Sequence, residues 1–180
     1  MMALDPSILQ PAVVELLALN GGGDRLLPLV CGKPSNAEAA ARLARASADE
    51  LFPGARSPVG ALAGLWLYFS CYEQCHSVAQ DLNTPEGSYW HAILHRQEPD
   101  DGNAGYWFRQ VGGHAIFPRL AEEAATLGYS ARSEEWDPFA FIEYCAKARS
   151  QPASDTERLA REVQRLEWQL LMDWCARVRR

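Results

Sequence analysis

The sequence predicts a single all-α domain over residues 1–180, either a helical bundle or a compact helical array. Three observations predict this fold class. Apolar residues recur at helical spacing along most of the chain, residues that start and end helices bracket these stretches, and no useful stretch alternates apolar with polar residues. The composition, 48% hydrophobic and 22% charged, is typical of a globular chain that folds without disulfides or metals.

The first helix is predicted from its start and end signals. Asp5 followed by Pro6 offers an N-cap and a proline at the first helical position, and apolar residues follow at helical spacing. Pro11 either kinks this helix or marks its true start. Asn20 and the three glycines after it end the helix.

Two capping boxes predict the next helices. Ser35 with Glu38 precedes an alanine-rich helix that ends near Ala46, and Ser47 with Glu50 starts a short helical turn.

Two longer helices follow. Ser57, followed by a proline, opens a helix predicted over 58–80, and Thr84, also followed by a proline, opens a helix predicted over 85–98. A further proline ends the second of them.

The last third of the chain is also predicted to be helical. Asp100 or Asp101 caps a helix that runs to Val111, and two more helices are expected over 114–127 and 138–149.

A third capping box, Ser154 with Glu157, opens the final helix. Five residues at helical spacing form the face that this helix buries: Leu159, Val163, Leu166, Leu170 and Trp174.

Charge and composition exclude several classes of partner. The net charge is −6 with no basic stripe, so we expect no nucleic-acid partner. The most apolar stretch, residues 59–72, is too short to span a bilayer, so we expect no membrane association. The N-terminal residues lack a signal-peptide pattern and the five cysteines form no CxxC pair, so we expect a cytoplasmic protein with reduced thiols.

One face of the helix predicted over 58–80 changes character along its length. Six residues spaced by three or four positions share this face: Leu62, Trp66, Phe69, Glu73, His76 and Gln80. The first three are apolar and the last three are polar, so a face directed at the core acquires groups that need partners. Glu73 and His76 also have the Glu-x-x-His spacing of metal ligands in some helical bundles.

The helix predicted over 85–98 repeats this anomaly with His91, His95 and Glu98 on one face. The connection between the two helices is short, so they should pack antiparallel, and facing residues then have position numbers with a nearly constant sum. Three facing pairs result: His76 with His91, Glu73 with His95, and Phe69 with Glu98.

Two interpretations of this cluster remain open. In the first, the facing helices bind a divalent first-row transition metal. The ligands would be Glu73, His76, His91 and His95. Glu98 or Asp100 would be the general acid or base, and metal-activated water would make hydrolysis of a small polar molecule the first reaction to test. In the second interpretation, the cluster is a buried hydrogen-bond network that only stabilises the fold. The alternative to both is that the two polar helix faces do not face each other and form no cluster.

Residues 89–114 also mix aromatic and polar side chains, as small-molecule pockets do. The candidates for ligand binding are Trp90, Arg96, Asn103, Tyr106, Trp107, Arg109 and His114. Arg109 either offers a fork of donors to an anionic ligand group or pairs with Glu98 or Asp100. Two readings without catalysis also remain open: a protein that only binds a ligand or partner, and an aromatic run that is simply core.

The same segment, YWHAILHRQEPDDGNAGYWFRQVGGH, resembles a group of uncharacterised bacterial proteins that share the pattern YWHAxxHRxExDxxNAxYWFRxVGxH. The match covers about a seventh of the chain. The resemblance supports the location of a site in this segment and implies no particular reaction.

Overall fold

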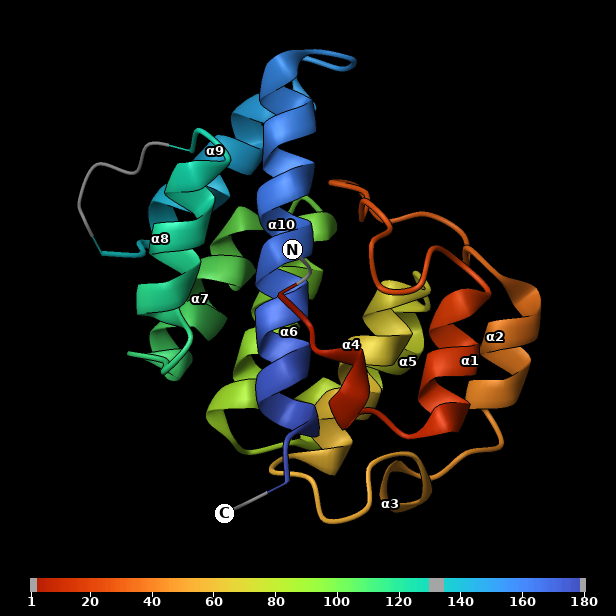
Figure 1. Ribbon diagram of the computed structural model, residues 1–180. Helices are drawn as coiled ribbons and strands as arrows, with labels where there is room; N and C mark the ends of the chain where they lie inside the picture. The colour runs from red at the N-terminus through yellow and green to blue at the C-terminus, as the bar shows by residue number, and fades with distance from the viewer. Residues whose placement is uncertain (1–2, 130–134, 179–180) are drawn as a thin grey trace.

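Helix α10, Asp155–Ala176, is the longest element and runs along the centre of the molecule, where it packs against α4, α8 and α9 (Figure 1). In the view of Figure 1, α1 and α2 lie on one side of α10, and α7, α8 and α9 lie on the other. The computed structural model describes residues 3–129 and 135–178. Within these ranges the regular elements are all helical, which confirms the all-α fold class.

The described residues form one 3-10 helix and ten α-helices. They are η1 (Pro6–Ile8), α1 (Pro11–Ala18), α2 (Ala37–Leu43), α3 (Ala48–Leu51), α4 (Pro58–Tyr68), α5 (Tyr72–Asp81), α6 (Pro85–Gln97), α7 (Asp101–Val111), α8 (Phe117–Thr126), α9 (Pro138–Arg149) and α10. Among them, no helix is both long enough and apolar enough to cross a membrane.

The start of the chain settles one alternative and corrects one prediction. Asp5 caps only η1, and Pro11 is the first residue of α1, so Pro11 marks the true start of that helix. The predicted Ser35 cap is wrong, because Asn36 is the N-cap of α2 and its side chain accepts from the backbone N–H of Ala39. The backbone N–H of Ser35 instead donates to the carbonyl of Phe69.

The helix predicted over 58–80 is wrong as one element, because it breaks into α4 and α5. Ser70 adopts a left-handed conformation with φ 58° and turns the chain. The N–H of Cys71 bonds to the carbonyl of Trp66, and the N–H of Ser70 bonds to that of Leu67. This pair of bonds is a Schellman motif, which normally uses glycine at the left-handed position. Because this position holds a serine and not a glycine, no signal in the sequence marked the end of the helix.

Most of the other predicted caps are confirmed. Ser47 forms the full capping box of α3 with Glu50, and the side chains of Thr84 and Asp100 cap α6 and α7. The side chain of Ser154 accepts from the backbone N–H of Glu157, as predicted. The Glu157 carboxylate accepts from the backbone N–H of Ala153 and not from that of Ser154, so the capping box is incomplete.

Gly64 allows α4, α6 and α10 to approach one another closely. A Cβ atom at this position would lie 2.7 Å from the ring of Trp90 on α6. From the other side, the indole N–H of Trp168 on α10 donates to the Gly64 carbonyl at 2.8 Å. Both tryptophans are fully buried. This contact fixes the position of α6, which carries two of the candidate histidines.

Candidate metal centre

Helices α5 and α6 form a helical hairpin that brings the candidate histidines together. They are joined by residues 82–84 and pack against each other, as the short connection predicted. His76 lies on α5, and His91 and His95 lie one turn apart on α6. One possible ligand atom from each of the three imidazoles lies within 4.8 Å of the other two.

The three imidazole rings are in direct contact. The rings of His76 and His91 meet edge to face, with centroids 4.6 Å apart, which confirms the predicted facing pair. His91 and His95 stack almost parallel at 4.8 Å. The ring of His76 also meets that of His95 edge to face at 5.6 Å. The sequence therefore placed these three side chains correctly relative to one another.

His91 is the least satisfied polar group of the cluster. The residue is only 2% exposed, and neither of its ring nitrogens has a hydrogen-bond partner among the described residues. Burial, with smaller contributions from His95 and His76, lowers the pKa of His91 to about 4. The imidazole is therefore neutral near pH 7, and neutral imidazole is the form that ligates metals.

Helix α7 covers the other face of His91 with an aromatic ring. The indole of Trp107 stacks on the His91 imidazole, with centroids 4.0 Å apart and 21° between the planes. Tyr106 meets the edge of Trp107 and is itself 47% exposed. Of the aromatic residues predicted to bind a ligand, Trp107 lies against the histidines, and Tyr106 lies against Trp107.

Glu98 supplies the carboxylate of the cluster. One of its oxygens lies 3.0 Å from Nδ1 of His95, an ion-pair distance at which the two groups are not aligned as a hydrogen bond. Burial lowers the pKa of His95, and the negative charge of Glu98 opposes this shift. A carboxylate behind an imidazole orients the ring and makes its other nitrogen a better metal ligand. The predicted facing pair of Phe69 with Glu98 stays untested, because Phe69 is the C-cap of α4 and the register between α5 and α6 does not extend to it.

Glu73 does not join the three histidines. It lies exposed in the first turn of α5 and lines a cavity of about 430 Å³ together with Glu98. The predicted facing pair of Glu73 with His95 is therefore replaced by the contact between Glu98 and His95. Among the described residues, the group whose nitrogen atoms lie close enough to ligate one ion consists of His76, His91 and His95.

Asp100 and Asn103 act on each other as a helix cap. The Asp100 carboxylate accepts from the backbone N–H of Asn103 at 3.1 Å and from its side-chain amide at 2.7 Å. These hydrogen bonds lower the pKa of Asp100. Both carboxylate oxygens are thus engaged in starting α7, which leaves Glu98 as the candidate general acid or base.

Arg96 and Trp90 lie in the core and not at the histidine cluster. Arg96 forms a buried ion pair with Glu167 of α10, in which the two side chains are 1% and 0% exposed. Two further hydrogen bonds complete this network: the hydroxyl of Tyr89 donates to Glu167, and the side-chain carbonyl of Gln164 accepts from Arg96. The ion pair already uses the charge of Arg96, so we do not include Arg96 or Trp90 in the proposed site.

The two remaining ligand candidates also lie apart from the three histidines. Arg109 is exposed on α7, and within the described part of the chain no ion pair joins it to Glu98 or Asp100. The pairing alternative is therefore wrong, and the anion-binding role is not supported. His114 is buried among Tyr89, Phe117 and Trp174.

Sequence reasoning missed the loop that completes the site. The N–H of Cys31 donates to the carbonyl of Gln97, and the N–H of Ser35 donates to that of Phe69. These two bonds hold the intervening loop over the ends of α4 and α6, where residues 31, 32 and 34 line the 430 Å³ cavity. No local pattern in a loop of this kind indicates which helix ends it will contact.

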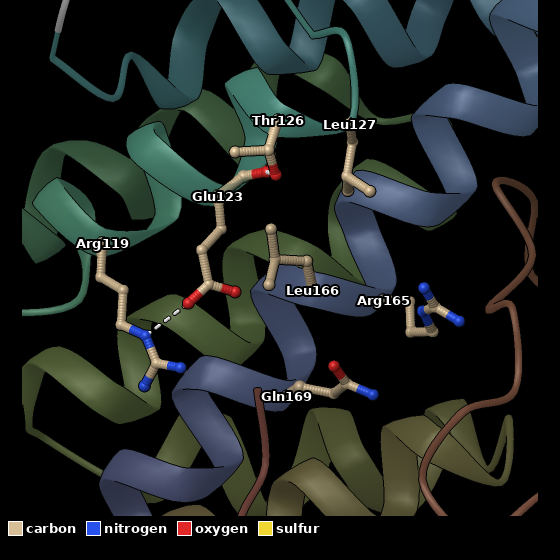
Figure 2. A pocket seen from close by; sticks show the side chains of 7 residues that line it. All are labelled: Arg119, Glu123, Thr126, Leu127, Arg165, Leu166 and Gln169. Carbon is tan, nitrogen blue, oxygen red and sulfur yellow. Dashed lines mark hydrogen bonds and ion pairs between the residues drawn. The ribbon is translucent and has the colours of Figure 1, made fainter. Parts of the chain in front are cut away.

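A different cavity lies between α8 and α10 and contains none of the predicted site residues. Figure 2 shows its lining, in which Arg119 pairs with Glu123 on α8 and Arg165 lies on α10. Its volume is about 270 Å³. Arg165 lies 3.7 Å from Asp24. With both arginines next to carboxylates, this cavity has no uncompensated charge to attract an ion.

Comparison with known proteins gives no relative. No protein-family model, no curated protein and no solved structure matches the chain. Functional inference therefore rests on the geometry of the site.

Proposed function

We propose that this protein binds a divalent first-row transition metal at His76, His91 and His95. The observation that carries the proposal is His91, a neutral and buried imidazole with two unpartnered nitrogens, held against two further imidazoles. Buried polar groups without partners are rare in folded proteins, and each one needs an explanation. A metal ion would satisfy one nitrogen of each ring.

A purely structural network explains the cluster less well. Such a network stabilises a fold by giving each buried polar group a hydrogen-bond partner. Here Glu98 lies 3.0 Å from His95, but neither nitrogen of His91 has a hydrogen-bond partner in the part of the chain that the structure describes. Contacts between the rings hold the cluster together, and they leave the nitrogens of His91 without a hydrogen-bond partner among the described residues.

The number and type of ligands favour a reactive centre over a closed structural one. Structural zinc sites usually have four protein ligands, whereas three histidines leave one position for water or substrate. A divalent ion in such a site lowers the pKa of a bound water to about 7. Glu98 would orient His95 and act as general acid or base. We therefore propose hydrolysis of a small polar molecule as the reaction class.

The first experiment measures metal binding. Protein purified without added metal is stripped with a chelator, dialysed, and titrated with Zn²⁺ and with Co²⁺, whose visible absorption reports the ligand geometry. We expect one ion per chain. His91→Ala and His76→Ala should each weaken binding at least about 100-fold, because each removes one of three ligands. The control is Gln80→Ala, an exposed position one turn further along α5.

Two results would contradict this proposal. A wild-type chain that binds neither ion, or histidine variants that bind as the wild type does, would exclude the metal centre. If the metal binds but the loaded protein hydrolyses no ester, amide or phosphoester, the hydrolytic part fails and a non-catalytic binding protein is favoured.

A further inference from the structure

A second cavity adjoins the one that contains Glu98. It has a volume of about 410 Å³ and shares Pro34, Cys71 and Gln74 with the 430 Å³ cavity. The two cavities therefore lie next to each other along α5, and we call them together the α2–α5 groove. Each volume is in the range of small-molecule sites.

The two ends of the groove differ in chemistry. At the far end the walls include Ala40 of α2, its C-cap Ala44, Trp66 of α4 and Val78 of α5, with Ser77 as the polar residue that this cavity alone contains. At the near end the walls carry two carboxylates, Glu73 and Glu98.

No lysine or arginine is among the residues that line either part of the groove. Two cations lie next to lining residues: Lys33 stands between Gly32 and Pro34 in the sequence, and Arg25 donates to Ser70 at 3.0 Å and to the carbonyl of Tyr68. The charged side chains that themselves line the near end are those of Glu73 and Glu98.

We propose that the α2–α5 groove binds a small organic ammonium ion with an apolar tail. The cationic head would lie between Glu73 and Glu98, and the tail would lie against Trp66 and Val78. The unlike ends determine this choice, since an anion would meet two carboxylates and a ligand without a tail would leave the apolar end unfilled.

This inference rests on the proposed function in one respect. Glu98 lines the near end of the groove, where the cationic head would lie, and it also lies 3.0 Å from Nδ1 of His95. An ammonium compound bound in the groove would thus be placed beside the proposed metal centre, as its substrate. Binding in the groove can nevertheless be measured without metal, so the two ideas fail separately.

The test uses n-hexylamine as the probe, with n-hexanoate and ethylamine as comparators. Binding is measured by saturation-transfer NMR and calorimetry at pH 7 on metal-free protein. We expect both comparators to bind at least about tenfold more weakly than hexylamine, because one reverses the head charge and the other lacks the tail.

Two variants locate the probe. Ala44→Phe fills the apolar end from an exposed position and should weaken hexylamine binding, whereas Ala41→Phe, exposed on the same helix and outside the groove, should not. Glu73→Gln should weaken hexylamine but not hexanol, which has the same tail and no charge. Thermal unfolding confirms that each variant is folded.

Equal binding of hexanoate and hexylamine, or an Ala44→Phe variant that binds as the wild type does, would overturn the groove assignment. Zinc titration of the same samples separates the two proposals. Zinc binding without hexylamine binding overturns this inference alone. Hexylamine binding without zinc binding supports the groove and overturns the metal centre.

Discussion

The imidazole of His91 lies between two rings, with Trp107 stacked on it at 4.0 Å and His95 at 4.8 Å. This stacking holds the ring in place, because no hydrogen bond from residues 3–129 or 135–178 does so. It also puts an indole fluorophore next to the proposed metal ligand.

Copper binding should therefore quench the fluorescence of Trp107. The chain has six tryptophans, so Cu²⁺ should remove only part of the emission. Trp107→Phe should abolish most of that quenching, whereas Trp174→Phe, beside His114, should retain it. Steady-state emission during a Cu²⁺ titration measures the effect. Quenching that persists unchanged in Trp107→Phe would place the ion elsewhere.

Replacing Glu98 should weaken metal binding without abolishing it. Glu98→Gln keeps the shape of the side chain but loses the charge that orients His95 and makes it more basic. Loss of such a partner typically lowers metal affinity about 10–100-fold. Competition titration against a chromophoric chelator gives the value, with Glu15→Gln, an exposed position on α1, as the control. Equal affinities in the two variants would remove Glu98 from the site.

The metal-free protein should lose stability as the pH falls from about 6.5 to about 4. Burial lowers the pKa of His91 from 6.5 to about 4 in the folded state, so in this window the unfolded chain takes up a proton that the folded chain does not. Stability from this group is complete above the unfolded pKa and falls by an amount on the order of 3 kcal/mol across the window.

Urea unfolding at several pH values, with a chelator present, measures this dependence. His91→Gln has no titrating ring at this position and should show a shallower loss over the same window. Identical pH slopes in the wild type and the variant would mean that His91 is not held in its neutral form by the fold.

The Arg96–Glu167 ion pair should matter for stability and not for metal binding. Glu167→Gln leaves the buried guanidinium without its counter-charge, which costs about 3–5 kcal/mol. Asp155→Asn, exposed on the same helix, should change stability by less than about 1 kcal/mol. The double variant Arg96→Met, Glu167→Leu removes both charges and should recover much of the loss, as judged by urea unfolding. Reduced zinc affinity in the folded double variant would contradict a purely structural role.

Local signals in the sequence account for most of the fold. Ser47, Thr84 and Asp100 start helices where the capping rules place them, because a cap is made within one turn of chain. The failures were also local. Asn36 is the N-cap of α2 where Ser35 was expected. Ser70 occupies a left-handed position at a helix end, where the usual residue is glycine.

The same reasoning determined the centre of the proposed site. His76, His91 and His95 share faces at helical spacing across a short connection, and that spacing is sufficient to bring them into contact. The predicted register between α5 and α6 did not extend one helical turn further. It paired Glu73 with His95, but the carboxylate next to His95 is that of Glu98, which lies three residues further along the same helix.

Only the tertiary structure decided the surroundings of these histidines. Arg96 faces Glu167 more than seventy residues away, Trp107 covers His91, and a loop distant in sequence closes the cavity beside Glu98. The physical reason is that helix periodicity fixes which residues share a face within one helix, whereas the partner of that face is chosen by how all the helices bury their apolar surfaces together.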